Sequence, residues 1–553
     1  MDGRLRGGGA VKTRVVILAV VGVLGVAAVA VAGVLGYQMF FGSSQDDAVA
    51  LVPADAAIYG NIFLDPSMNQ KRAIEDLLEK FPEAPNADEA RNKLVDLLDE
   101  GLAEIDMNFD DDIDPWLGNQ VAGWAQIPED LGGGAGAETP LEGTETPPAA
   151  FLIASDDDEA AIQFVEEASA NSDDELRDER YEGADYVLNE EESSAAGVVD
   201  GFLVIGTEAG FKAVVDVSGG DDNLSDSETF TDATDDLTED RLATFYFDGG
   251  AFAEALEEGG APPGALEFGS FGMLGGSLSP TAGALFVQSD KVVFESTTMP
   301  GAEDGEELPE ISDGLLPDVP GDSWGAFGIP DLGTTLEELY DALLEASPQG
   351  GTGSPFDLDA QIEEQTGLNL REDLLSWMGD AGLFVSGTDP LAVGGGLVIE
   401  STDPATSSAT VDRLAGLLLQ QGIPTEPLSA GGAEGFTVEI PEPGVTERVV
   451  VLAGDRVVIA YGEDAAVDAL ESSDPLSESE AFQTATEGLG DDFTAAGYFD
   501  VDAMQELAEA AGAGQFPEYE EDVKPWLDPF TYVTFGSRED GGRLVQRLVI
   551  GID

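Results

Sequence analysis

The sequence predicts an α+β protein, in which an N-terminal transmembrane helix precedes two tandem copies of an antiparallel sheet-plus-helices module. Three observations support this prediction. An uncharged apolar run lies near the N-terminus, one segment recurs later in the chain, and short strands joined by hairpins alternate with amphipathic helices. The chain has 553 residues, which is too long for one ordinary hydrophobic core.

The apolar run covers residues 15–41 and is long enough to span a bilayer. Basic residues precede it within 1–14, and acidic residues follow it, so the positive-inside rule places 1–14 in the cytoplasm and the bulk of the chain outside. A cleavable signal peptide is the alternative, because small residues alternate at 28–32. The apolar run continues to residue 41, beyond a normal signal core, which favours an uncleaved single-pass anchor in the cell membrane.

The recurring segment sets the predicted domain boundaries. LSDSETFTDATDDLTEDRLATFYFD (224–248) aligns without a gap with LSESEAFQTATEGLGDDFTAAGYFD (476–500), and DDDIDPWLGN (110–119) matches REDLLSWMGD (371–380). The predicted parts are a juxtamembrane linker at 42–51, a first module at 52–300 with a flexible low-complexity loop at 131–148, a linker at 301–317 and a second module at 318–553.

Periodicity predicts the elements of the first copy in order. Expected strands are 58–64, 120–127, 149–154, 186–189, a hairpin turning at Asp200-Gly201, 243–248, 284–288 and 291–297. Expected helices are 68–81, 87–105, 159–170, 208–217, 227–237 and 251–257.

The charge of the chain narrows its environment and its partners. Its 112 acidic residues against 22 basic ones give a formal net charge of −90. Such a charge destabilises a compact state unless salt screens it, which indicates a halophilic or salt-tolerant source. A calcium-rich or acidic-matrix role is the alternative. A nucleic-acid partner is excluded, because a polyanion would be repelled and no basic stripe exists.

Two absent residue types exclude most familiar enzyme chemistry. Without Cys the chain has no disulfide, thiolate zinc site, cysteine nucleophile or lipid-attachment cysteine. Without His it has no Ser-His-Asp triad and lacks the commonest general base near neutral pH. Catalysis would have to use carboxylates, Lys, Tyr, Ser, Thr or a hard metal ion.

Three stretches resemble a known family: VPADAAIYGNIFLDP (52–66), LLEKFP (77–82) and DDDIDPWLG (110–118). Together with the N-terminal anchor, they resemble membrane-anchored bacterial extracytoplasmic proteins catalogued only as a domain of unknown function. The resemblance covers nearly the whole chain after the anchor. It implies no activity, ligand or functional residue.

A metal site is considered at Asp106, Asp110, Asp112 and Asp114, because closely spaced carboxylates can hold Ca²⁺. The stretch lacks the glycine and the final glutamate of an EF-hand loop, and a solvated acidic turn before a Trp-anchored strand is the plainer interpretation. The acidic run 155–159 is interpreted as a helix start, and Asp248 and Asp500 as caps of the helices that follow them. No catalytic or cofactor-binding residue is predicted. Trp124, Trp324 and Trp526 are expected in the core.

These observations predict a non-enzymatic binding or scaffolding protein of the cell envelope, held at the membrane by its anchor. Its partner would be an envelope protein or polymer that the sequence does not identify. The alternative is an extracytoplasmic hydrolase that uses paired carboxylates, with or without a divalent cation, on wall polymer. A buried carboxylate pair in one cleft would favour the enzyme.

Overall fold

The computed structural model describes residues 45–82, 107–128, 146–171, 176–190, 193–258, 279–299, 311–345, 358–390, 393–439, 448–471, 473–517 and 519–553, with single helical residues between 92 and 102. The predicted anchor at 15–41 therefore lies outside the described residues, as do 131–145 of the predicted loop and 301–310 of the predicted linker. Within the described residues, no helix is both long and apolar enough to cross a membrane. The chain divides into two compact units, with the boundary near residue 300.

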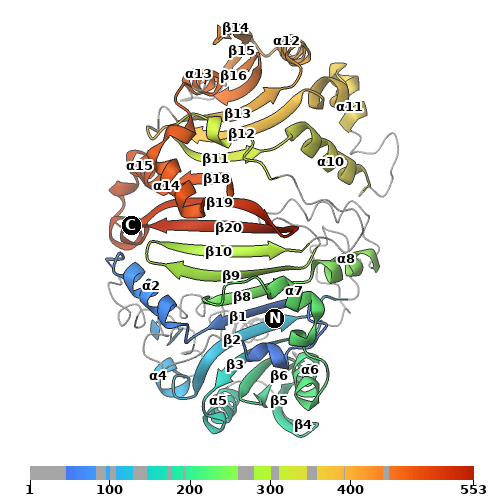
Figure 1. The fold of residues 1–553 in the computed structure, drawn as a ribbon, viewed down its shortest axis with the longest axis vertical. Helices are drawn as coiled ribbons and strands as arrows, with labels where there is room; N and C mark the ends of the chain where they lie inside the picture. The colour runs from blue at the N-terminus through green and yellow to red at the C-terminus, as the bar shows by residue number, and fades with distance from the viewer. Residues whose placement is uncertain are drawn as a thin grey trace, which may run out of the picture. The chain divides into compact units, whose positions relative to one another are not determined.

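In the first unit the strands pair in the order β4-β5-β6-β7-β3-β2-β1-β8-β9, and each of these pairs is antiparallel. The strands are β1 (Ile58–Phe63), β2 (Leu117–Ala125), β3 (Ala149–Ser155), β4 (Leu176–Tyr181), β5 (Ala184–Asn189), β6 (Ser194–Val199), β7 (Phe202–Thr207), β8 (Ala243–Phe247), β9 (Thr281–Gln288) and the larger part of β10 (Lys291–Thr298). The helices are η2 (Ala48–Leu51), α2 (Met68–Leu78), α4 (Phe109–Asp112), α5 (Asp158–Asn171), α6 (Glu208–Gly219), η4 (Leu224–Asp226), α7 (Glu228–Thr234) and α8 (Gly249–Glu258) (Figure 1).

In the second unit the strands pair in the order β14-β15-β16-β17-β13-β12-β11-β18-β19-β20, again antiparallel. The strands are β11 (Ser323–Ile329), β12 (Met378–Ser386), β13 (Gly394–Ser401), β14 (Thr425–Ala430), β15 (Ala433–Glu439), β16 (Arg448–Ala453), β17 (Arg456–Tyr461), β18 (Thr494–Asp500), β19 (Phe530–Asp540) and β20 (Arg543–Ile552). The helices are η5 (Leu316–Asp318), α10 (Leu332–Glu345), α11 (Leu358–Thr366), η6 (Leu370–Leu375), α12 (Pro404–Gln420), α13 (Glu463–Glu471), η7 (Leu476–Glu478), α14 (Glu480–Leu489), α15 (Val501–Ala510), η8 (Ala513–Gln515), η9 (Tyr519–Val523) and α16 (Lys524–Leu527).

The predicted fold class, with two tandem sheet modules, is wrong. The twenty strands of the described residues belong to one antiparallel sheet. The similarity between the two halves of the sequence indicates that the same local elements form in each half. How far a sheet extends depends instead on which strands satisfy each other's backbone N–H and C=O groups. Two separate sheets would have twice as many edge strands with unpaired backbone groups, which proteins avoid.

Both faces of the sheet in the first unit carry core. One face holds Tyr59, Trp124 and Leu152 and packs against buried residues of η2, α6 and α7. The other face, at one end of its strands, packs against α4 and α5 through side chains such as Phe109 and Phe164. Because Ala48–Leu51 is buried in the first core, these residues are part of the unit and not of a free linker.

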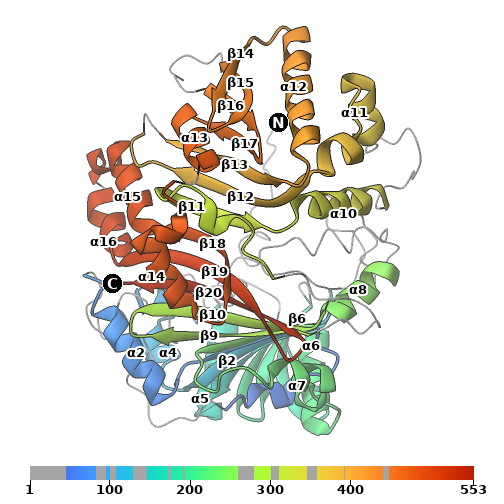
Figure 2. The ribbon, with the colours of Figure 1, turned by 45° about the horizontal axis from the view of Figure 1, so that its top comes forward.

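The second unit has an equivalent helix-covered region on one face of its sheet. Helix α12 lies against β15 and β16 (Figure 2), and Val411 of α12 shares a buried cluster with Phe436 and Val451. At the start of this unit, Leu316 is fully buried, and the Leu315 N–H donates to the Ala381 carbonyl oxygen at a distance of 3.0 Å. Residues 311–317, predicted as linker, therefore pack onto the unit.

Candidate functional site

The acidic stretch considered as a calcium site, and interpreted as a solvated acidic turn, forms a capped turn. The Asp112 carboxylate accepts the backbone N–H of Asn108 at 2.7 Å, and the Asn108 side chain accepts the N–H of Asp111 at 2.9 Å. The indole N–H of Trp116 donates to the Asp112 carbonyl oxygen at 2.7 Å. Asp110 and Asp114 also have partners, and Asp106 lies outside the described residues. Among the described residues no cluster of three or more acidic side chains is arranged to hold a metal ion.

The same turn is built in the second unit. The Asp373 carboxylate accepts the Asn369 N–H at 2.7 Å, and the indole of Trp377 donates to the Asp373 carbonyl oxygen at 3.0 Å. Trp116 and Trp377 are 2% and 3% exposed. A carboxylate that holds an N–H at a helix start and leads to a buried indole explains the acidic residues by capping, without a metal.

Other acidic residues predicted as caps do cap helices. Asp248 accepts the N–H of Ala251 at 3.0 Å, and Asp500 accepts that of Ala503 at 2.9 Å. In the acidic run 155–159, Asp157 accepts the N–H of Glu159 at 3.2 Å. Capping satisfies helix donors that would otherwise lack a partner.

A polar cluster that sequence reasoning missed lies where the described chain begins, at the N-terminal start of the first unit. The Tyr59 hydroxyl donates to both carboxylate oxygens of Asp46, at 2.7 and 2.8 Å, and the Val49 N–H donates to Asp46 at 3.2 Å. Arg241 lies close enough for its charge to favour the ionised form of Asp46, and its guanidinium donates to the Thr244 hydroxyl at 2.7 Å and the Thr238 carbonyl at 2.7 Å. The signal available in the sequence was Asp46 itself, the first acidic residue after the predicted anchor at 15–41.

Burial controls the protonation of this cluster. Desolvation raises the pKa of Asp46, although the hydrogen bond from Tyr59 opposes it. Desolvation, followed by the nearby Asp46 charge, raises the pKa of Tyr59 well above its ordinary value, and burial lowers the pKa of Arg241. Tyr59 is only 1% exposed. The Tyr59 hydroxyl is therefore shielded from solvent, and the cluster fixes residue 46 to strand β1.

The neighbouring polar side chains extend the cluster along the same face of β1. The Asn61 side chain, fully buried, donates to the Gln120 side-chain oxygen at 3.2 Å, while its own oxygen has no hydrogen-bond partner among the described residues. The indole N–H of Trp124, 3% exposed, likewise has none within the part of the chain that the structure describes. Trp124 is thus in the core as predicted, whereas Trp526 is 37% exposed and is not.

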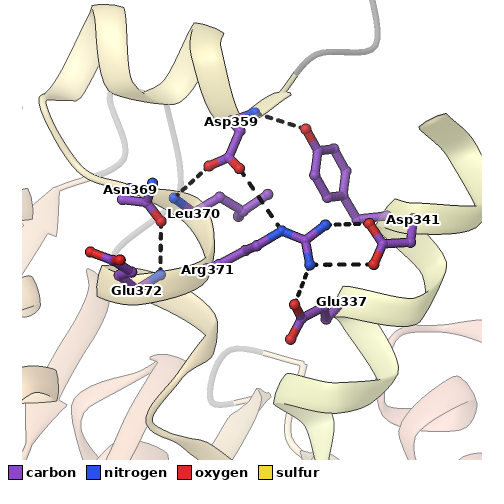
Figure 3. Close-up of polar contacts among 8 residues, drawn as sticks. Glu337, Asp341, Asp359, Asn369, Leu370, Arg371 and Glu372 are labelled. Atoms are coloured by element: carbon purple, nitrogen blue, oxygen red, sulfur yellow. Dashed lines mark hydrogen bonds and ion pairs between the residues drawn. The ribbon is translucent and has the colours of Figure 1, made fainter. Parts of the chain in front are cut away.

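The second unit holds an arginine cluster of a different kind (Figure 3). Arg371 of η6 donates to Glu337 and Asp341, both on α10, and its Nε lies 3.9 Å from a carboxylate oxygen of Asp359 on α11. The guanidinium also lies over the Tyr340 ring, 5.4 Å from its centroid. The hydrogen bonds that Arg371 donates to Asp341 and Glu337 raise its pKa. One cation thus joins three helices and neutralises part of their negative charge.

The first unit also presents an uncharged sheet face, opposite to the face that carries Tyr59. Gly60 on β1 pairs with Gly123 on β2 and with Phe245 on β8, and Gly123 pairs with Phe151 on β3. The row on one side is equally free of charge and holds Ile58, Ala125, Ala149, Phe247 and Thr281. On the other side Val121, Ile153 and Leu203 are also uncharged, but they are buried against α4 and α5. In a chain with 24% charged residues, such a face is a distinct surface.

Comparison with known proteins identifies the family. The profile of a family described as a protein of unknown function (DUF3352) matches residues 14–540. The chain belongs to this family. Its members are defined by sequence and carry no assigned activity in that description, so the family supplies no functional residue. The predicted resemblance to a domain of unknown function is thereby confirmed.

Other comparisons add little. No curated protein matches the chain. One solved structure, titled "Structure of crystal form I of TP0453", matches with a TM-score of 0.24 and 11% identity, covering 48% of this chain and 82% of that chain. A likeness this weak carries no argument about the DUF3352 chain.

Proposed function

We propose that the chain is a membrane-anchored, extracytoplasmic binding protein of the cell envelope without catalytic activity. Residues 15–41 are its single-pass anchor, and residues 1–14 stay in the cytoplasm. The observation that carries the binding role is the uncharged sheet face around Gly60, because a chain with a net charge of −90 otherwise presents an acidic surface. Large exposed apolar side chains on such a face are typical of binding sites.

The remaining polar features support binding over chemistry. The Asp46 carboxylate accepts from the Tyr59 hydroxyl, and Tyr59 is 1% exposed. The acidic residues that the sequence brings to attention, Asp112, Asp248 and Asp500, hold backbone N–H groups. Their oxygens are used in capping, which leaves them poorly suited to proton transfer.

Topology and activity test this proposal together. Protease added to intact spheroplasts should degrade the chain beyond residue 42, and detergent should not be needed. Purified full chain should release no product from wall polymer. Full protection from protease would contradict the external location, and hydrolysis abolished by one carboxylate substitution would contradict the binding role.

We also propose that the protein is adapted to salt. Its charge of −90 repels itself, and the screening length falls from about 10 Å at about 0.1 M salt to about 3 Å at about 1 M. The unfolding midpoint in urea should therefore rise with NaCl concentration. Urea is the suitable denaturant because it is uncharged and leaves the ionic strength unchanged. A flat or falling midpoint would contradict salt adaptation.

A further inference from the structure

Two buried polar atoms on the inner face of the first unit, which is the face that carries Tyr59, need a hydrogen-bond partner. Asn61 on β1 is fully buried, and its side-chain oxygen Oδ1 has no such partner among the described residues. Trp124 on β2 is 3% exposed, and its indole N–H has none in the same described part of the chain. Leaving a buried donor or acceptor unpaired destabilises a fold, so each of these atoms indicates a partner that the side chains do not supply.

The strand register brings these two atoms to one place. Tyr59 pairs with Trp124, and Asn61 follows two residues later on the same face of β1, so Asn61 and Trp124 are diagonal neighbours. Diagonal neighbours lie about 7–8 Å apart, which is within reach of an aromatic side chain. The residue that pairs with Asn61 is Ala122, which carries only a methyl group. A small molecule over Ala122 is therefore within reach of both atoms.

The amide of Asn61 is oriented by the bonds that its nitrogen makes. This nitrogen donates to the Gln120 side-chain oxygen at 3.2 Å. Desolvation raises the pKa of Asp46, and a hydrogen bond with Asn61 is among the contacts that oppose this rise. Gln120 is the other diagonal neighbour of Asn61, on the opposite side of Ala122 from Trp124. The unpaired oxygen is thus on the side of the planar amide away from Gln120, where Trp124 lies.

Thr244 on β8 provides a third polar group at the same place. It pairs directly with Asn61 and is 4% exposed. The Thr244 hydroxyl oxygen accepts from the Arg241 guanidinium at 2.7 Å, and the hydroxyl can donate its own proton as well. The inner face therefore combines one acceptor, Asn61 Oδ1, with two donors.

All three polar residues differ in the second unit. The equivalent positions follow from the pairing of β11 with β12 and β18 and from the gapless alignment of 224–248 with 476–500. Asn61, Trp124 and Thr244 correspond there to Gly328, Phe384 and Ala496. The acceptor and both donors are thus exchanged together for side chains that need no hydrogen-bond partner. Such a joint exchange is expected of residues that hold one ligand.

The chemistry of these groups defines the ligand. It accepts a hydrogen bond from the Trp124 N–H and donates one to Asn61 Oδ1. A simple anion has no proton to donate, and a metal cation cannot accept a hydrogen bond, so both are excluded. The ligand is also small and shielded from solvent, because Tyr59, Asn61 and Trp124 are each at most 3% exposed. Water meets these conditions, since buried waters in proteins typically bond about three polar groups.

We propose that the first unit binds an internal water molecule on the inner face of its sheet, bonded to Asn61 Oδ1, the Trp124 indole N–H and the Thr244 hydroxyl. The water holds the Asn61 amide in one orientation, so that its nitrogen stays directed at Gln120 and Asp46. It is a structural ligand, and it connects the polar cluster around Asp46 to strand β2.

The test is NMR on the full chain in detergent micelles, with isotope-labelled tryptophan indoles. A water of long residence gives its neighbours a nuclear Overhauser effect of opposite sign in the laboratory and rotating frames, whereas proton exchange gives the same sign in both. Trp116 and Trp377 are matched controls in the same molecule, because they are equally buried and their N–H groups donate to the carbonyl oxygens of Asp112 and Asp373. The Trp124 indole should show contact with water, and the two control indoles should not.

A variant distinguishes a water shared with Asn61 from one that contacts Trp124 alone. Asn61→Leu keeps the size of the side chain and removes the acceptor, so the water contact at Trp124 should fall about tenfold. The matched control Asn119→Leu makes the same change at a half-buried residue directly before Gln120 on β2. This control should leave the water contact at Trp124 unchanged.

Each outcome decides the proposal. Water contact at Trp124 that is lost in Asn61→Leu supports it, provided that the Trp116 and Trp377 signals show the variant to be folded. An unaltered chain without water contact at Trp124 would overturn it, and this measurement does not depend on any variant. Equal contact in Asn61→Leu and the unaltered chain would overturn it too. Equal contact at all three indoles would show general penetration of solvent and would also overturn it.

Discussion

The first strands of the two units, β1 and β11, occupy equivalent places in the pairing order but carry different side chains. Tyr59 of β1 is opposite Tyr246 of β8, and Ala326 of β11 is opposite Tyr498 of β18. The residue after Tyr59 is Gly60, whereas the residue after Ala326 is Phe327. The first unit thus has a polar group on its inner face and bare backbone on its outer face. The second unit has a methyl group and a ring at these places.

This difference extends to the side chains around the strands. In the first unit Asp46 has Tyr59 as a hydrogen-bond partner and Arg241 nearby. In the second unit Asp313 precedes β11, and a Cβ at Gly328 would lie 1.7 Å from the Asp313 carbonyl oxygen, so the chain itself fills the space. The arginine cluster of this unit, around Arg371, lies among the helices instead. Two units with the same order of strand pairing can therefore have polar side chains in the interior of one and apolar side chains at the equivalent place in the other.

Replacing Arg241 in the first unit and Arg371 in the second should sharpen the contrast most. Arg241→Met removes the positive charge near Asp46 and the donor to the Thr238 carbonyl and the Thr244 hydroxyl, and should lower the free energy of unfolding by about 3 kcal/mol. Arg371→Met removes ion pairs whose arginine side chain is 33% exposed, and should cost less than about 1 kcal/mol. Urea unfolding followed by circular dichroism measures both. Equal costs would mean that burial does not distinguish the two arginines.

The two tyrosine hydroxyls should show the same contrast with a smaller effect. Tyr59→Phe removes the hydroxyl that donates to both oxygens of the desolvated Asp46 carboxylate, and should cost about 2 kcal/mol. Tyr498→Phe removes one longer bond, 3.3 Å, to Asp500, and should cost about 0.5 kcal/mol. Hydrogen exchange resolved by peptide would assign each loss to its unit. A larger loss from Tyr498→Phe would contradict the comparison.

Two aspartates should give opposite pH dependences. The pKa of Asp46 is raised above 3.8 by desolvation, so its contribution to stability is fully present below pH 3.8 and is lost as pH rises through the raised pKa. The pKa of Asp403 is lowered below 3.8 by a hydrogen bond from Thr406, so its contribution is present above pH 3.8 and is lost as pH falls through the lowered pKa.

The measurement compares the unaltered chain with Asp46→Asn and with Asp403→Asn across acidic pH. The stability difference between the unaltered chain and Asp46→Asn should decrease as pH rises through the raised pKa of Asp46. The difference for Asp403→Asn should decrease as pH falls below 3.8. The same sign for both would show that Asp46 is not desolvated in solution.

Local elements followed well from the sequence where periodicity was strong. The hairpin predicted at Asp200-Gly201 joins β6 and β7, and these two residues have φ values of 46° and 81°, as a primed turn requires. Strand β4 was missed, because its sequence LRDERY has four consecutive charged residues and no alternation. It pairs with β5 alone among the described strands, and an edge strand can be charged on both sides.

The candidate sites were less predictable than the elements. Capping by Asp248 and Asp500 could be predicted because a strand ending in Asp before a helix has a local cause. The Asp46–Tyr59–Arg241 cluster joins residues far apart in the chain, and the continuity of the sheet depends on pairing that no local pattern encodes. The uncharged face around Gly60 also emerges only when the register of β1, β2, β3 and β8 is known.

The edge strands β4 and β14 resist aggregation by different means. In β4, the side chains of residues 177–180 are exposed and charged, so repulsion discourages a second strand from adding to it. In β14, Pro427 has no backbone N–H to donate to an added strand, and its ring obstructs pairing. Neither effect depends on the solvent. Salt that relieves the self-repulsion of the folded chain also weakens the protection of β4, while that of β14 persists. Fibrils formed at very high salt should therefore incorporate β4 first.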